Sequence, residues 1–526
     1  MDSVYSSRLN QGLGWVPALR RKKIFAAIAI LAVASVGEDC RTRAASPIDV
    51  GSRKQLFVDE LFFSTSKGVT LKIRSPRKTG DVILKPGHPW ERATLNWFNV
   101  IQDRGRIDVN AKYRMWYEAY DVDGWPTGDD TSFCYAESRD GTHWTKPHLG
   151  LFSYKNSTRN NILFRQIGSA AQGNHSRVHG AGVFVDPHAP PHARYKAVSQ
   201  GIFARLGKHS YRIAGMYSAD GLKWTRYPQP ICNLFADSQY SGFWDRALGK
   251  YVLYGRVSAR GRALGRSASG DFTHFDPLKL VLQSDDKDPP NSDLYNSAAI
   301  KYSYADNIYL MFPSLYQHST DTLDIHLAVS RDGIRWSRPD RKTPWIALGN
   351  PDEFDGGSLY MGQGMIRVGD ELWLYYSGSR LRHNQAKLAN LIKPRNARIY
   401  SRVVTRLDRF VAATAGADGG FFTTPLLSFT GKTLQLNLNV HPGGRVRVGL
   451  LDEQGRTIPG YSVKDCRPIA GDSVSTRVTW TRGSDVSFRE KKPTRLRVDM
   501  TRAELYSFQV VSTNAKTNSQ QRKMGP

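Results

Sequence analysis

A tyrosine-containing strand pattern recurs five times along the chain and limits the possible folds more than any other feature. Each copy alternates apolar and polar residues, begins after a polar turn and follows another apolar strand. Period-2 alternation between turns rich in Asp, Gly and Asn is typical of β-hairpins. The five copies lie at residues 112–120, 193–201, 249–257, 307–315 and 370–378.

A second motif, Ser-x-Asp-Gly-x-x-Trp, occurs at residues 138–144, 218–224 and 330–336, with a degenerate copy at 267–275. An Asp-Gly pair favours a tight hairpin turn because both central positions require a positive φ. We therefore expect these acidic residues to support turns rather than catalysis, and the Trp to fill the gap between neighbouring sheets. Five repeats of about 60 residues, each equivalent to about four strands, predict a five-bladed β-propeller over residues 47–413.

The chain changes character after residue 413. A Gly-rich break is followed by short alternating strands up to residue 511, without helical periodicity. Such a run of about 90 residues is typical of a β-sandwich. The sequence therefore predicts an all-β protein in which a five-bladed β-propeller precedes a C-terminal β-sandwich at residues 419–511 and a disordered tail at 512–526.

The N-terminus has the features of an export signal. Four basic residues, 20–23, precede an apolar run at 24–36. In a helix this run would span about 20 Å, which is less than the ~30 Å thickness of the hydrocarbon core of a membrane. A signal peptide within residues 1–36 and a secreted or periplasmic location are therefore predicted, and the alternative is an uncleaved N-terminal anchor. No membrane contact is expected beyond this segment.

The chain carries a formal net charge of +27, from 74 Lys and Arg against 47 Asp and Glu. Such an excess favours an anionic partner, and nucleic acid is the first class that it suggests. Export and the lack of nucleic-acid-binding motifs argue against that class, so a sulfated or uronic-acid glycan is the expected partner. The four cysteines have no metal-ligand spacing, so neither a metal nor a cofactor is expected. The protein is expected to be a monomer.

Six segments carry a resemblance to a known group of proteins. They are LFVDE, HPWE, DLYNSAAIKY, MFPSLYQH, EFDGGSLY and GFFTTPLLSFTGKTLQLNLN, at residues 56–60, 88–91, 293–302, 311–318, 353–360 and 420–439. In these segments the chain resembles secreted five-bladed β-propeller proteins of the glycosyl hydrolase family 32/43-like type, which are abundant in planctomycete-type bacteria. The resemblance extends over about residues 47–511 and implies a glycoside hydrolase built from a propeller and a C-terminal sandwich.

Acidic residues precede the expected inner strand in four of the five repeats. Hydrolysis of a glycosidic bond requires two carboxyl groups that flank the bond. The inner strands of a propeller converge on its axis, so acids at their starts are candidates for an axial cleft. Asp293 and Asp355 are the predicted catalytic pair, and Asp237 and Glu91 are further candidates. A turn or a local ion pair is the alternative role for each of them.

Aromatic rings and forked donors in the same windows are candidates for substrate binding. Arginine suits planar or multi-oxygen anions better than lysine does. Core packing is the alternative role for the aromatic residues. The predicted substrate contacts are Trp97, Arg177, Tyr240, Arg256, Arg266, Tyr295, His318 and Tyr360.

These features together predict a secreted glycoside hydrolase that cleaves a glycosidic bond in a poly- or oligosaccharide of anionic character. The predicted mechanism uses a carboxylate pair in the axial cleft and passes through an oxocarbenium-like transition state. Because propellers carry many unrelated functions, the alternative is a non-catalytic propeller that binds carbohydrate or acts as a surface scaffold.

Overall fold

The computed structural model describes residues 46–103, 112–121, 131–165, 178–205, 208–385 and 398–512. The predicted signal segment, Arg177 and the predicted tail after residue 512 lie outside these ranges. Within them the regular structure is almost entirely β, and no helix is long and apolar enough to cross a membrane. The described helices are short 3-10 turns: η1 (Glu60–Phe62), η2 (Pro89–Glu91), η4 (Pro191–Ala193) and η6 (Ser487–Arg489).

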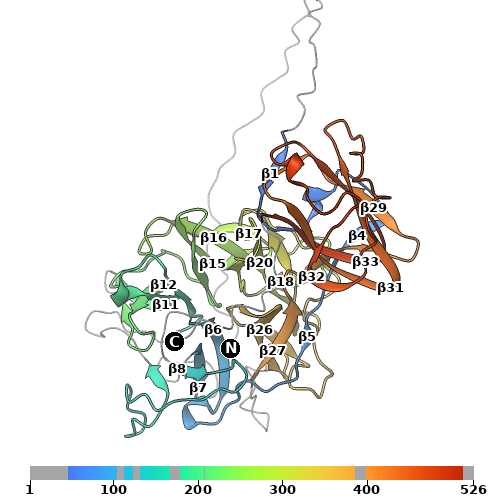
Figure 1. Ribbon diagram of the computed structural model, residues 1–526. Coiled ribbons are helices and arrows are strands. Elements are labelled where there is room, and N and C mark those ends of the chain that lie inside the picture. The colour runs from blue at the N-terminus through green and yellow to red at the C-terminus, as the bar shows by residue number, and fades with distance from the viewer. Residues whose placement is uncertain are drawn as a thin grey trace, which may run out of the picture. The chain divides into compact units, whose positions relative to one another are not determined.

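Three four-stranded antiparallel sheets follow one another along the chain, each with its strands in sequence order (Figure 1). The second strand of each sheet contains one of the tyrosine repeats and pairs with a neighbour on both sides. Such meanders are the usual blades of a propeller. The strands are β6 (Thr94–Gln102), β7 (Tyr113–Tyr120), β8 (Thr131–Ser138) and β9 (Ile162–Phe164); β10 (Gly182–Val185), β11 (Tyr195–Arg205), β12 (Lys208–Ser218) and β13 (Thr225–Arg226); and β14 (Ser241–Asp245), β15 (Lys250–Ala259), β16 (Gly261–Ser269) and β17 (Lys279–Leu282).

The last two repeats differ from the predicted pair of separate blades. A three-stranded sheet contains the strand of the fourth repeat, but the fifth repeat belongs to an eight-stranded sheet. The two halves of this larger sheet are joined because β22 pairs in parallel with β24. The three-stranded sheet contains β19 (Ile300–Lys301), β20 (Tyr309–Met311) and β23 (Ala328–Ser330), and the larger one contains β18 (Ser292–Leu294), β21 (Ser314–Gln317), β22 (Thr322–Ile325), β24 (Ser358–Met361), β25 (Ile366–Val368), β26 (Glu371–Ser379), β27 (Ile399–Arg406) and β5 (Arg77–Lys78).

The first Ser-x-Asp-Gly-x-x-Trp motif forms the turn that its sequence predicts. Ser138 Oγ accepts the N–H of Gly141 at 2.8 Å, and the Asp140 carboxylate accepts the N–H groups of the two residues that follow Gly141. Gly141 has a φ of +78°, which glycine adopts without strain. Its carbonyl accepts a hydrogen bond of 2.8 Å from the hydroxyl of Tyr375 on β26.

The other two complete motifs make the same kind of contact with a neighbouring sheet. The carbonyl of Gly221, after β12, accepts from Trp116 on β7, and that of Gly333, after β23, accepts from Tyr254 on β15; both bonds are 2.6 Å long. Each turn therefore binds the sheet that precedes it, and the turn of the first sheet binds β26 of the last repeat. Buried apolar clusters join the second sheet to the third and the three-stranded sheet to the last repeat. Together with the turns, these contacts run around a closed ring, which is a propeller arrangement.

The C-terminal strands form one large sheet that includes strands from near the N-terminus. Its long central pair is β31 (Thr433–Leu451) and β33 (Arg495–Val511), and β2, β3 and β4 pair with C-terminal strands. The strands β1 and β30 form a separate two-stranded parallel ladder. The predicted two-sheet sandwich is therefore not confirmed. The remaining strands are β1 (Ile48–Gly51), β2 (Gln55–Leu56), β3 (Thr65–Lys67), β4 (Val69–Ile73), β28 (Val411–Ala415), β29 (Gly420–Thr423), β30 (Leu427–Phe429) and β32 (Gly471–Arg477).

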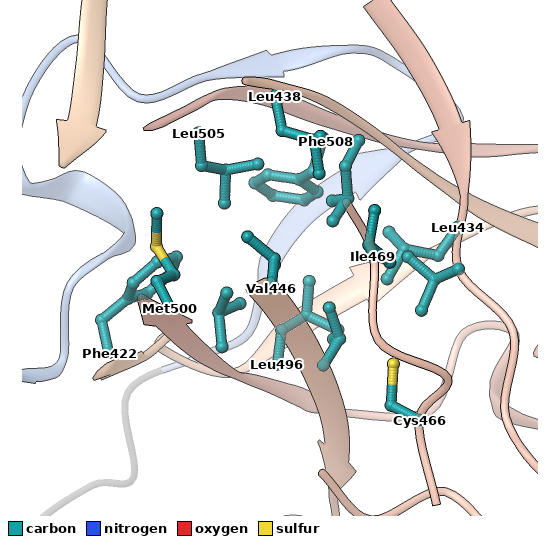
Figure 2. Close-up of a cluster of buried hydrophobic side chains, with 14 of the residues drawn as sticks. Phe422, Leu434, Leu438, Val446, Cys466, Ile469, Leu496, Met500, Leu505 and Phe508 are labelled. Carbon is teal, nitrogen blue, oxygen red and sulfur yellow. The ribbon is translucent and has the colours of Figure 1, made fainter. Parts of the chain in front are cut away.

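Apolar side chains from these C-terminal strands form a buried core (Figure 2). Alternate residues of β31, such as Leu438, and of β33, such as Phe508, point into it, as the period-2 pattern requires. Val50 of β1 and Phe57 belong to the same cluster. The segment before the propeller strands is therefore part of the C-terminal core.

Candidate functional site

Buried amide and hydroxyl groups join the first strands of successive sheets and the residues just before those strands. Asn99 on β6 donates to the carbonyl of Ala181 at 2.9 Å, and Gln239, just before β14, donates to the same carbonyl at 3.0 Å. The hydroxyls of Ser241 on β14 and Ser297 before β19 are 2.8 Å apart. These bonds fix where the first strands begin, and the segments before them carry the polar and aromatic residues described next.

An aromatic cluster contains three of the predicted substrate contacts. Trp97, Tyr295 and Tyr360 pack together with Tyr316 and Leu323. The ring centroids are 5.0 Å apart for Trp97 and Tyr360 and 5.5 Å apart for Tyr295 and Tyr360, with edge-to-face geometry. The cluster is possible because β18, β21, β22 and β24 belong to one sheet. All five residues are buried, with at most 9% of any one of them exposed.

Three arginine side chains lie over the rings of this cluster. The guanidinium of Arg256 on β15 is 5.7 Å from the ring centroid of Tyr295, and that of Arg262 on β16 is 4.9 Å from it. The guanidinium of Arg398 is 4.4 Å from the ring centroid of Tyr360. Arg256 was predicted from the sequence, whereas Arg262 and Arg398 lie outside the pre-strand windows and were missed.

Asp237 is the most accessible of the predicted acids near this cluster. Its side chain is 26% exposed, with Oδ1 2.9 Å from His179 Nε2 and Oδ2 3.6 Å from Arg256 Nη2. Burial raises the pKa of the Tyr295 hydroxyl, and the Asp237 charge raises it further, while the three arginines oppose this effect. Arg256 therefore links the Asp237 carboxylate to the ring of Tyr295.

Asp293 reaches the same ring through Arg262. Its Oδ2 accepts hydrogen bonds from the side-chain Nη1 of Arg262 at 3.1 Å and from the backbone N–H of the same residue at 3.2 Å. The same oxygen lies 3.0 Å from His318 Nε2. Although burial lowers the pKa of Arg262, the Asp293 charge raises it above its ordinary value. Oδ1 of Asp293 is buried and accepts no hydrogen bond from a described residue. Asp293 and His318 also line a pocket of about 710 Å³.

A buried carboxylate that was not predicted from the sequence contacts His179, the residue that also contacts Asp237. Glu118 on β7 is fully buried, and its Oε1 accepts the N–H groups of Gly180 and Ala181. Its Oε2 is 3.3 Å from Nδ1 of His179, whose other nitrogen faces Asp237. Glu118 lies within the tyrosine repeat at residues 112–120, from which only a strand was predicted.

Asp355, the other member of the predicted pair, shares no hydrogen-bond partner with Asp293 among the described residues. Asp355 is buried, and its Oδ2 accepts from Lys78 Nζ at 2.7 Å and from the Tyr376 hydroxyl at 2.9 Å. Among the described residues, neither Lys78 nor Tyr376 contacts Asp293. Lys78 belongs to β5, and the pairing of β5 with β27 places this lysine beside the Asp355 carboxylate.

Glu91 also lies in a separate ion-paired environment. It is fully buried in η2 and accepts from Lys146 Nζ at 2.7 Å and from the Tyr117 hydroxyl at 2.7 Å. It also accepts the N–H groups of Gly87 and His88, which cap the 3-10 turn. These contacts give Glu91 a turn-capping role and an ion pair, the alternative roles for this residue, although Lys146 lies 55 residues away in the chain.

Two other predicted contacts lie between sheets rather than in the aromatic cluster. Tyr240 is fully buried and donates to the carbonyl of Ala236, and burial raises its pKa. Arg266 on β16 lies 6.0 Å from the ring centroid of Tyr254 on the adjacent strand. His318 is instead 45% exposed beside Asp293, and Arg177 lies outside the described residues.

No family model and no curated protein matches the chain. Similar solved structures include a glycosyl hydrolase from Bacteroides ovatus, with 16% identity, coverage of 69% of this chain and 99% of that chain, and a TM-score of 0.43. An N-acetylgalactosamine deacetylase from F. plautii has 12% identity, coverage of 65% and 97%, and a TM-score of 0.44. A member of the GH130 family of mannoside phosphorylases, which contains glycoside hydrolases that target β-1,2 mannosidic linkages, has 16% identity, coverage of 69% and 99%, and a TM-score of 0.42. Values at this level assign neither a family nor an activity to this chain.

Proposed function

We propose that the protein is a secreted glycoside hydrolase acting on a poly- or oligosaccharide, with Asp237 and Asp293 as its carboxylate pair. The supporting observation is that both acids border the ring of Tyr295. Asp237 does so through Arg256, and Asp293 does so through Arg262. Hydrolysis of a glycosidic bond requires two carboxyl groups that flank the bond, and these two acids are the candidates for that arrangement.

The two acids divide the reaction between them. One protonates the glycosidic oxygen as the bond from that oxygen to the anomeric carbon breaks, and the other either activates water or attacks the anomeric carbon. Water finally supplies the hydroxyl group at the anomeric carbon. Asp237 is accessible and held by His179, whereas Asp293 offers the buried Oδ1 that no described donor occupies.

The test is the release of reducing sugar from a panel of polysaccharides by the wild type, Asp237→Asn and Asp293→Asn. Each variant should lose about a hundredfold or more in rate, because each removes an acid–base group. Asp370→Asn is the matched control, since Asp370 is exposed and its side chain has no hydrogen bond within the described ranges. Wild-type rates in either site variant would overturn the proposed pair.

A non-catalytic carbohydrate-binding or scaffold protein is the second candidate. It is favoured by the burial of Asp293, whose side chain is 4% exposed and paired with Arg262. A structural ion pair of this kind holds the arginine in place without chemistry. Binding of a glycan by the wild type without release of sugar would establish this candidate and exclude the hydrolase.

We also propose that β25, β26, β27 and β5 act as a fifth blade, closed by β5. The supporting observation is their antiparallel pairing in that order, together with the bond from Tyr375 to Gly141 of the first sheet. We further propose that β1 and β30 act as the second layer of a C-terminal sandwich. Val50 of β1 and Phe429 of β30 share the core of the large sheet, which supports this role.

A further inference from the structure

The charge balance around Tyr295 and Tyr360 is uneven. Arg262 is neutralised by a hydrogen-bonded carboxylate, that of Asp293. Arg398 is only 8% exposed and forms no ion pair with any residue in the described ranges. Its guanidinium lies over the Tyr360 ring, and an aromatic face offsets only part of the free-energy cost of burying a cation.

Arg256 has open donors as well. Its guanidinium is 3.6 Å from the Asp237 carboxylate, which is longer than a hydrogen bond, and it donates no hydrogen bond to a described residue. The side chain is 18% exposed, so a ligand can reach it. Arg256 and Arg398 therefore face one aromatic pair, Tyr295 and Tyr360, and neither guanidinium is hydrogen-bonded to a carboxylate of the described residues.

A buried cation is stable in a protein when a negative group hydrogen-bonds to it. Guanidinium groups match carboxylate and sulfate because both present two oxygens at the spacing of the donor fork. A neutral sugar hydroxyl would satisfy one donor but would leave the charge of Arg398 unbalanced. Arg398, which has no ion pair within the described ranges, and Arg256, whose contact with Asp237 is longer than a hydrogen bond, thus discriminate between sugar classes.

We infer that the site recognises a sugar bearing an anionic group, a carboxylate or a sulfate ester, with Arg398 and Arg256 as the donors that bind it. This inference rests on the proposed function in taking the cluster as a carbohydrate site. It adds two specificity-determining residues, one of which no sequence pattern identified.

Matched pairs of probes test this directly. One pair is an oligogalacturonide and its methyl ester, which differ only in the charge of the carboxyl groups; the other is a κ-carrageenan oligosaccharide and its desulfated form. Calorimetric titration should show that the wild type prefers the charged member of at least one pair by about tenfold or more. The preferred pair distinguishes a uronic-acid ligand from a sulfated one.

Arg398→Gln and Arg256→Gln should each abolish most of that preference, because each lowers the affinity for the charged member more than the affinity for the neutral one. Arg477→Gln, at an exposed arginine on β32, is the matched control and should bind as the wild type does. Arg398→Lys keeps the charge but not the fork and should bind the charged member with intermediate affinity. If Arg398→Gln does not fold, the wild-type preference and Arg256→Gln carry the test.

The inference is overturned if the wild type binds neither charged probe, binds both members of each pair equally, or keeps its preference in the glutamine variants. These outcomes are separate from those of the proposed hydrolysis. Preference for a charged probe without cleavage supports the anion site and contradicts the hydrolase. Equal cleavage of charged and neutral glycans supports the hydrolase and contradicts the anion site.

Discussion

Replacing Asp408 with asparagine is expected to destabilise the protein by about 3 kcal/mol. Asp408 is fully buried, and its carboxylate accepts from Lys54 Nζ at 2.8 Å and from the Tyr302 hydroxyl at 2.6 Å. It also accepts from Ser507 at 3.0 Å and from Asn437 at 3.3 Å. Asparagine has nearly the same size and tolerates the φ of +69° at this position, so the substitution removes the charge and leaves the backbone unchanged.

The magnitude follows from the cation that is left behind. The Lys54 side chain is 17% exposed and has no second ion pair within the described ranges. Removing one partner of a buried ion pair costs about 3–5 kcal/mol, and the amide oxygen still accepts one hydrogen bond worth about 1 kcal/mol. Replacing Lys54 with methionine in the Asp408→Asn background removes the unpaired charge and should restore about 1 kcal/mol or more.

Urea unfolding followed by tryptophan fluorescence gives the free energy of unfolding for the wild type, both single variants and the double variant. Asp370→Asn, at an exposed carboxylate, should change this free energy by less than about 0.5 kcal/mol. A loss below about 1 kcal/mol in Asp408→Asn, or strictly additive single effects, would show that the buried pair does not stabilise the fold.

Two further predictions concern the turns. Tyr375→Phe removes the donor to the Gly141 carbonyl, and thermal unfolding should show a loss of about 1 kcal/mol; an unchanged Tm would mean that this bond does not join the first sheet to the last repeat. Although burial raises it, hydrogen bonds from the N–H groups of Arg335 and Ile334 lower the pKa of Asp332 to about 2. Because the unfolded pKa is about 4, the carboxylate stabilises the fold above that pH, and its contribution is lost as the pH falls from about 4 to about 2. Asp332→Asn should therefore be less stable than the wild type at pH 7 and equal to it near pH 2, and a difference that does not vary with pH would contradict the role of this carboxylate.

The sequence predicted the hairpins because short-range patterns specify them. Alternation and Asp-Gly turns identify strands and the bends between consecutive strands, and three meander sheets followed from them. The pairing of β22 with β24, and of β4 with β28, joins segments that no turn connects. Alternation does not show which edge such a strand will meet, so the merged eight-stranded sheet and the single large C-terminal sheet were not predicted.

The same limit explains the mixed outcome for the aromatic residues of the site. Trp97, Tyr295 and Tyr360 occupy equivalent places before or within the first strands, and the structure gathers them. Tyr240 occupies a similar place, but its side chain is buried between the second and third sheets. The adjacent Ser241 instead makes a hydrogen bond with the hydroxyl of Ser297. A shift of one residue along a strand moves a side chain to the other face of the sheet. The segments used for the prediction were several residues long, so they did not define which face each side chain would occupy.

The charged residues of the site were harder to predict than the rings. Lys78, which neutralises Asp355, lies 277 residues away from it in the chain, so no local pattern indicates that this acid is already paired. Arg262 lies on β16, and Arg398 lies in a segment just before β27. Neither residue belongs to the segments that precede the expected inner strands, from which the candidates came. Their relevance depends on which carboxylates reach them, and that is a property of the folded chain.

The net charge of +27 and the unpaired Arg398 predict different kinds of binding. A diffuse positive surface attracts any polyanion, and this attraction is screened by salt and largely insensitive to which sugar carries the charge. A buried guanidinium is screened much less and acts only at hydrogen-bond distance. Preference for an oligogalacturonide over its methyl ester that persists at ~0.5 M salt would therefore originate at Arg398 and Arg256. Affinity for the charged member that disappears at that salt concentration would originate in the overall charge and would refute recognition by the site.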